Sequence, residues 1–149
     1  MSGALEIAVS QLHVREVPPG SNRGPEVDGY VRSVGLDPAG AYPWCAAFVY
    51  WCFMQAKIGA VNPCPRTGSA LGLWKLSPDS AKGKIEPGGV FVMDFGHGTG
   101  HVGLIESIDG AWLTTIEGNT NVEGQREGIG VFRRKRAVPS INKGFLYFG

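Results

Sequence analysis

The hydrophobic pattern of this chain changes its period once, near Gly88. Before that residue, apolar side chains recur at helical spacing. After it they form short runs rich in β-branched and aromatic residues, separated by glycine-containing turns. Helices followed by consecutive strands are typical of an α+β domain, in which the helices pack on an antiparallel sheet. Because no repeat or low-complexity linker interrupts the sequence, we expect one domain over residues 1–149.

Four helices are expected before the change and five strands after it. The apolar spacing and the positions of proline and glycine predict helices over 4–14, 25–35, 43–57 and 69–76. The strands are expected over 90–95, 101–108, 112–117, 129–136 and 145–148. The helix over 43–57 should pack against the sheet.

Composition excludes several functional classes. A net charge of +1 is not that of a nucleic-acid-binding protein. One basic cluster, Arg133 to Arg136, follows two apolar residues and is expected on an exposed strand face, with a polyanion contact as the alternative. No window approaches the roughly 18 apolar residues of a membrane span.

The first residues of the chain and its cysteine content indicate the cellular compartment in which it is made. The first twenty residues lack the basic and apolar regions of a signal peptide, so we expect synthesis in the cytoplasm without a cleavable leader. The three cysteines are then expected to be reduced. Cys52 is expected as a core thiol and Cys64 as a loop thiol, with a bridge between them as the alternative.

Cys45 stands at the predicted start of the third helix, directly after a proline and a tryptophan. Unpaired N–H groups and the positive end of the helix dipole favour a thiolate at such a position and lower its pKa. A cysteine in an apolar helix is commonly only a small buried side chain. Its place at the helix start makes it a candidate nucleophile.

The residues that a cysteine nucleophile requires follow in order. His101 opens the second strand and is the candidate general base and acid, and Glu117 and Asn119 end the third. Residues two apart share one face of a regular strand, so both could orient the imidazole. Glu117 is preferred because a carboxylate stabilises the imidazolium more strongly, and Asn119 is the alternative. His97, in a glycine-rich loop, competes as the base or as a substrate contact.

These motifs together resemble a known family. YPWCAAFVYWCF, IEPGGVFVM, GHVGLIE and EGNTN occur in the order found in the CHAP domain, a cysteine- and histidine-dependent amidohydrolase/peptidase of the papain-like peptidoglycan hydrolases. The likeness covers about residues 22–148. It implies the papain-like fold, Cys45 as nucleophile, His101 as base and then acid, and Glu117 or Asn119 as the orienting group.

Two positions depart from the family pattern. Some members carry an aspartate-rich calcium loop before the nucleophile, where this chain has only Asp37, so we expect no calcium dependence. The family often has Gly-Asp-Val where residues 88–90 read Gly-Gly-Val, a local change in a turn. Neither metal nor cofactor is expected, since the chemistry needs none and no paired metal-ligand spacing occurs.

The resemblance also implies a substrate, bacterial peptidoglycan. The bond would be the muramoyl–L-alanine amide or one within the stem peptide or cross-bridge. The side chains expected to contact it are Tyr42, Trp44, Trp74, Phe95 and His97. We expect a monomeric phage lysis enzyme or antibacterial effector that acts on the wall after release or export. Its holin, immunity or delivery partner is unknown. The alternatives are a hydrolase or deamidase toxin acting on a non-wall amide, and a non-catalytic wall-binding module.

Overall fold

Five antiparallel strands form one sheet in the order β4-β3-β2-β1-β5. The computed structural model describes residues 3–57, 59–120 and 128–149. The strands are β1 (Val90–Gly96), β2 (Thr99–Asp109), β3 (Trp112–Thr120), β4 (Gly130–Ala137) and β5 (Gly144–Leu146). Strands β1 to β4 follow one another as a meander, and β5 returns to pair with β1.

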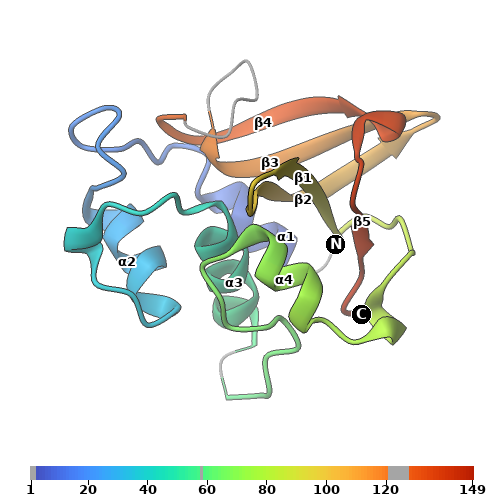
Figure 1. Cartoon of the computed structure of the whole chain (residues 1–149), viewed down its shortest axis with the longest axis horizontal. Coiled ribbons are helices and arrows are strands. Elements are labelled where there is room, and N and C mark those ends of the chain that lie inside the picture. Colours follow the sequence, from blue (N-terminus) through green and yellow to red (C-terminus); the bar gives the residue numbers. More distant parts are fainter. Residues whose placement is uncertain (1–2, 58, 121–127) are drawn as a thin grey trace.

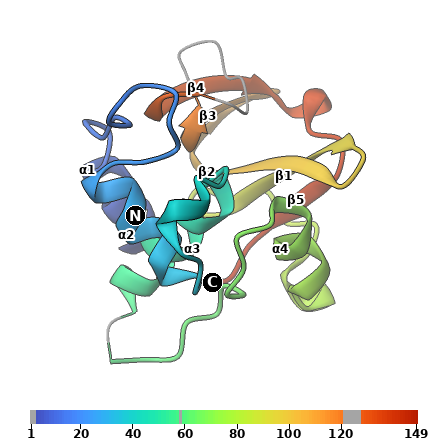
Figure 2. The same ribbon diagram turned by 60° about the vertical axis from the view of Figure 1, so that its left-hand side comes forward.

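Within the described residues, four α-helices precede the sheet in sequence and gather on one side of it (Figure 1). They are α1 (Gly3–Ser10), α2 (Pro25–Ser33), α3 (Cys45–Ala56) and α4 (Ala70–Leu76). Figure 2, turned by 60°, shows α4 below the β1 and β5 edge, away from α1 and α2. The domain is therefore α+β, as the change of period near Gly88 predicts.

The sheet has a buried apolar cluster on each face. Toward the helices, alternate strand residues such as Val92, Val102 and Ile116 pack with the apolar face of α3. The opposite face buries Phe91, Ile105 and Leu113 under Ile141. Because side chains alternate along a strand, a residue's parity decides which cluster it joins. His101, Gly103 and Ile105 thus share the face away from the helices.

The first helix is shorter than expected. It ends at Ser10, whereas the apolar spacing predicts helix as far as residue 14. Val14 is buried in the core, its carbonyl accepts a hydrogen bond from the N–H of Val131, and Arg15 forms an isolated β-bridge with Gly130. Pairing with β4 competes with the helix there, and a period-based prediction cannot see it. The other three helices agree with the prediction within two residues.

Strand β3 runs past its predicted end at Glu117 to Thr120, and its pairing with β4 shifts register between these residues. Asn119 sits in this bulge at φ 58°, a left-handed conformation that asparagine tolerates better than most residues. The assumption that Glu117 and Asn119 lie two apart on a regular strand is therefore wrong. Among the described residues, no helix has the length and apolar character needed to span a membrane.

Candidate active site

Cys45 is the first residue of α3, as the sequence predicts. Trp44 occupies the N-cap position, and its side chain makes no capping hydrogen bond. Cys45 therefore lies at the positive end of the helix dipole, where the first-turn N–H groups have no intrahelical partners. The Cys45 side chain is nearly buried, with 3% of the residue exposed. The helix dipole favours the thiolate form of Cys45, whereas burial opposes it.

His101 and Glu117 meet between neighbouring strands. Nε2 of His101 on β2 lies 2.8 Å from Oε1 of Glu117 on β3, and both side chains are fully buried. Nδ1 of His101 has no nitrogen or oxygen partner within the described part of the chain, which leaves it for the thiol of Cys45. A hydrogen bond with Cys45 contributes to the charge state of this imidazole. The structure thus makes Glu117 the direct partner of His101.

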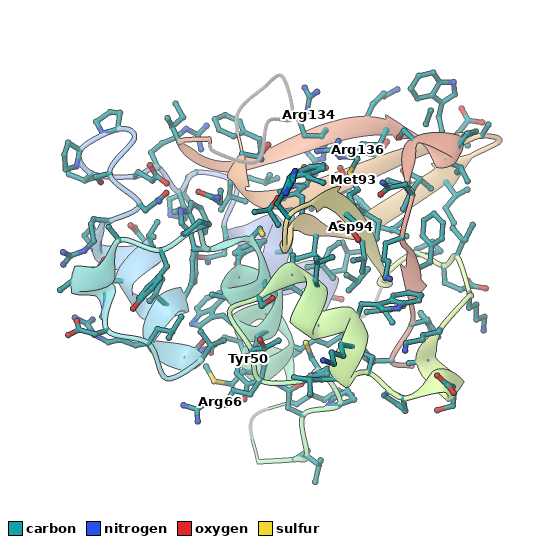
Figure 3. The ribbon with its side chains drawn as sticks, in the orientation of Figure 1. Tyr50, Arg66, Met93, Asp94, Arg134 and Arg136 are labelled. Carbon is teal, nitrogen blue, oxygen red and sulfur yellow. The ribbon has the colours of Figure 1, made fainter. Side chains whose placement is uncertain are left out.

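Glu117 is held by three further hydrogen bonds. Arg136 on β4 donates from Nε to Oε2 and from a terminal nitrogen to Oε1, each at 2.6 Å. The hydroxyl of Thr115 donates to Oε2 at 2.6 Å. Figure 3 labels Arg136 on β4 and Met93 on β1, the strands that flank β2 and β3. Both carboxylate oxygens are satisfied, so a buried charge is tolerated here.

These contacts move two pKa values in opposite directions. Burial alone would lower the pKa of His101, but its hydrogen bonds and charge interactions with Cys45 and Glu117 outweigh burial and raise it to about 9. Burial alone would raise the pKa of Glu117, but Arg136 and His101 lower it to about 2. At neutral pH the site therefore holds an imidazolium beside a carboxylate, the pairing that favours a cysteine thiolate.

Trp44 was expected to line the substrate cleft, and this prediction is wrong. Its ring is fully buried against Tyr30 and Phe48. The indole Nε1 donates to Oε2 of buried Glu16 at 2.7 Å. Although Trp44 is next to Cys45 in sequence, its side chain is part of the core on the helix side.

The other predicted substrate contacts reach the surface. Tyr42, before α3, and Phe95, at the end of β1, are 41% and 45% exposed. His97 is exposed in the turn between β1 and β2 at φ 56°, and the carboxylate partner belongs to His101 instead. Trp74 is half-buried on α4 and lines a pocket. Substrate contact by these four residues stays a prediction. Asn119 is fully buried in its bulge, and its role stays a prediction too.

Sequence reasoning missed Arg136 and Thr115. The basic cluster does alternate, as expected: Arg133 is exposed and pairs with Glu106, at 2.6 Å between Nε and Oε1. Arg136 belongs to the opposite face, where its side chain is only 12% exposed, so the expectation of a solvated face fails for it. The available signal was the position of Thr115, two residues before Glu117 in the same predicted strand, and of Arg136 in the next predicted strand.

The remaining cysteines lie apart from this chemistry. Cys52 and Cys64 are buried free thiols, and burial raises the pKa of each. The alternative of a bridge between them is not formed. In the described ranges, no group of three or more histidine, cysteine or acidic side chains is arranged as a metal site.

Comparison with known proteins places this arrangement in context. The family model of the CHAP domain matches residues 37–119, from the segment before α3 to the bulge of β3. No curated protein matches the sequence. Two crystal structures share the fold: that of Ly7917, with a TM-score of 0.54 and 21% identity, and that of Ly7917 with the hydrolyzing product of MDP, with a TM-score of 0.52 and 21% identity.

The matched region covers nearly all of this chain but a smaller share of the Ly7917 chains. The first comparison covers 97% of this chain and 58% of the Ly7917 chain, and the second covers 99% and 62%. This chain thus spans about three fifths of the length of those chains. The likeness extends over nearly all the elements described above, including those outside the family match.

Proposed function

Because the chain belongs to the CHAP domain family, we propose that it is a cysteine-dependent hydrolase that cuts an amide bond of bacterial peptidoglycan. The observation that carries the proposal is the buried chain of hydrogen bonds from Cys45 through His101 to Glu117, called the catalytic line below. The Ly7917 structure that holds the hydrolyzing product of MDP supports hydrolysis of wall fragments by this fold. The bond is proposed to be the muramoyl–L-alanine amide or a peptide bond of the stem or cross-bridge.

The first half of the reaction forms a thioester. The thiolate of Cys45 attacks the amide carbonyl carbon, and the oxyanion that forms is held by backbone N–H groups at the start of α3. The His101 imidazolium then gives its proton to the leaving amine as the carbon–nitrogen bond breaks. The amine departs neutral, and the acyl group stays on the sulfur of Cys45.

The second half regenerates the enzyme. Neutral His101 takes a proton from water, whose oxygen attacks the thioester carbonyl, and the acid product leaves as the thiolate returns. Glu117 keeps the ring in one orientation and stabilises its positive charge before and after each transfer. Arg136 and Thr115 hold Glu117 and so act as positioning residues.

Digestion of purified sacculi tests the proposal. Wild type and Cys45→Ala are incubated with sacculi, and the soluble products are identified by mass spectrometry, with Cys52→Ala as a control that removes a thiol outside the site. Glycan strands freed of intact stem peptides identify an amidase, and split stems or cross-bridges identify an endopeptidase. If wild type releases no more than Cys45→Ala, the site acts on another amide or on none.

We propose further that the protein acts as a monomer on the wall after release or export, in a phage lysis or antibacterial setting. The family assignment supports this, since the substrate lies outside the cytoplasm. Cells exposed to added protein should lyse, whereas cells that produce it internally should grow until their membrane is permeabilised. Lysis from inside without permeabilisation would contradict the proposed setting.

A further inference from the structure

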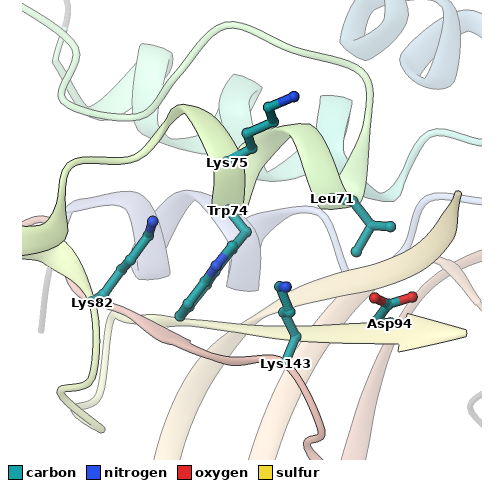
Figure 4. A pocket seen from close by; sticks show the side chains of 6 residues that line it. All are labelled: Leu71, Trp74, Lys75, Lys82, Asp94 and Lys143. Atoms are coloured by element: carbon teal, nitrogen blue, oxygen red, sulfur yellow. The ribbon is translucent and has the colours of Figure 1, made fainter. Parts of the chain in front are cut away.

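A pocket of about 350 Å³ lies between α4 and the β1–β5 edge of the sheet (Figure 4). Its lining combines an aromatic ring with charges of both signs. The residues are Leu71, Trp74, Lys75, Lys82, Asp94 and Lys143. Lys82 also pairs with Asp79, outside the lining, at 3.6 Å between Nζ and Oδ1, but three lysines against these two aspartates still leave a net positive charge.

Trp74 is the floor of this pocket. Lys82 and Lys143 place their ammonium groups 4.9 and 6.0 Å from the centre of its ring. The ring lies on Gly144, where an added β-carbon would come within 2.5 Å of it. Only glycine allows this approach, so the backbone of β5 fixes the ring from below. A flat ring beside two cations suits a ligand that carries both apolar and anionic groups.

Asp94 and Lys143 bring opposite charges to the same pocket without pairing. No described residue forms an ion pair with either side chain. Their spacing is fixed by the backbone: the N–H and C=O of Asp94 bond to the side chain of Asn142, each at 2.8 Å, and the N–H of Lys143 donates to Val92 at 3.2 Å. In Figure 4 Lys143 stands between Trp74 and Asp94. A ligand with an ammonium and a carboxylate on one carbon would satisfy both groups.

The pocket adjoins the catalytic strand. Asp94 pairs with Gly100 in the β1–β2 ladder, and an added β-carbon at Gly100 would lie 3.0 Å from Leu71. Gly100 is the residue directly before His101. Asp94, which lines the pocket, therefore lies directly across the ladder from the neighbour of His101.

We propose that this pocket selects the third residue of the peptidoglycan stem, and that it favours diaminopimelate over lysine. The side chain of diaminopimelate ends in an ammonium and a carboxylate on one carbon, whereas that of lysine ends in an ammonium alone. Lys143 binds the carboxylate, Asp94 binds the ammonium, and Trp74 contacts the methylene chain. This inference rests on the proposed function, since it assumes a stem peptide as substrate.

Another pocket supplies a matched control. At the far end of the sheet, Asp109, Trp112 and Lys135 line a surface hollow with Thr114. It has the same residue types, but it lies at the tip of the β2–β3 hairpin, where Asp109 pairs with Trp112. A stem peptide at the catalytic line cannot extend to it. Lys135→Gln therefore removes an equivalent surface charge without touching the proposed site.

Binding is measured by calorimetry on Cys45→Ala, which prevents turnover. The probes are L-Ala–γ-D-Glu–diaminopimelate, the same peptide with lysine, and the diaminopimelate peptide amidated at its side-chain carboxyl. We expect the unmodified diaminopimelate peptide to bind about tenfold more tightly than the other two. Adding Lys143→Gln or Asp94→Asn should abolish that preference, and Lys135→Gln should leave it intact. Asparagine keeps the oxygen that accepts from the N–H of Gly96.

Equal binding of the three peptides, or no binding of any, would overturn the inference. So would a loss in Lys143→Gln that is the same for all three peptides, because that is general attraction of anions. Digestion of diaminopimelate-type and lysine-type sacculi separates this inference from the proposed function. If wild type digests neither, the proposed function fails; if it digests both equally and Lys143→Gln changes nothing, only the selectivity is lost.

Discussion

Arg136 and Glu117 form a bidentate ion pair inside the sheet, with both nitrogen–oxygen distances at 2.6 Å. The pair joins β4 to β3, and its carboxylate continues to His101 on β2. Three neighbouring strands are thereby connected through one buried carboxylate. The stability of the sheet and the charge state of the His101 imidazole depend on the same side chain.

Arg136→Gln should lower the free energy of unfolding by roughly 3–5 kcal/mol, because it leaves the Glu117 charge buried with one cationic partner fewer. Arg133→Gln is the control. Arg133 is on β4 like Arg136 and makes a similar bidentate pair, with Glu106 on β2, but its side chain is 49% exposed. Its loss should cost about 0–1 kcal/mol. Urea unfolding measures both. Equal effects would show that the Arg136 pair is no more buried in solution than the Arg133 pair.

The His101–Glu117 pair should make stability depend on pH on both sides. His101 has its pKa raised from 6.5 to about 9, so its contribution is complete below pH 6.5 and is lost as pH rises through 9. Glu117 has its pKa lowered from 4.5 to about 2, so its contribution is complete above pH 4.5 and is lost as pH falls through 2. The pair therefore stabilises the fold most between pH 4.5 and 6.5. Chemical unfolding across pH measures this, and Glu117→Gln should flatten the alkaline decline; an unchanged curve would mean that His101 owes its pKa to another group.

Alkylation should distinguish the three thiols. Iodoacetamide at neutral pH is expected to modify Cys45 first, because the imidazolium of His101 favours its thiolate, whereas burial raises the pKa of Cys52 and Cys64. Peptide mapping by mass spectrometry identifies the site. Cys45→Ser should remove the fast phase and Cys52→Ala should keep it. Fast labelling of Cys64 in the folded protein would contradict this order.

Trp44→Phe should destabilise the fold and leave substrate binding unchanged. The substitution keeps an aromatic ring but removes the indole N–H that donates a hydrogen bond to Oε2 of Glu16. The other oxygen of Glu16, Oε1, already has no hydrogen-bond partner among the described residues. Leaving the buried carboxylate without this donor should cost about 1–3 kcal/mol. Thermal unfolding gives the loss, and KM on soluble wall fragments checks the second point. A raised KM with unchanged stability would restore Trp44 as a substrate contact.

The sequence predicted where the candidate residues lie in the fold when their placement depends on local pattern. Cys45 at a helix start and His101 on a strand follow from hydrophobic spacing, and so does the alternation within the basic cluster. Arg136 was missed because its partner Glu117 lies nineteen residues away, and only the β3–β4 register brings them together. Trp44 was misjudged for a related reason, since its burial depends on the distant Glu16.

Asn119 illustrates a different limit. Its spacing from Glu117 suggested a shared face, which holds only for a regular strand. The shift of register in β3 is a tertiary feature that depends on pairing with β4, so the local sequence Glu-Gly-Asn does not predict it. The shorter α1 has the same cause, because Val14 pairs with β4 instead of continuing the helix.

The turn of the β2–β3 hairpin lies far from His101 along β2. Asp109 lies eight residues after His101 on β2, which corresponds to roughly 26 Å of strand. The exposed two-residue tip begins with Gly110 at φ 59°, and the carbonyl of the following Ala111 accepts from Val138. Exposed loop tips tolerate inserted sequence, so the bond between Gly110 and Ala111 is where a fluorescent reporter or a cell-targeting module could be grafted without reaching the thiol.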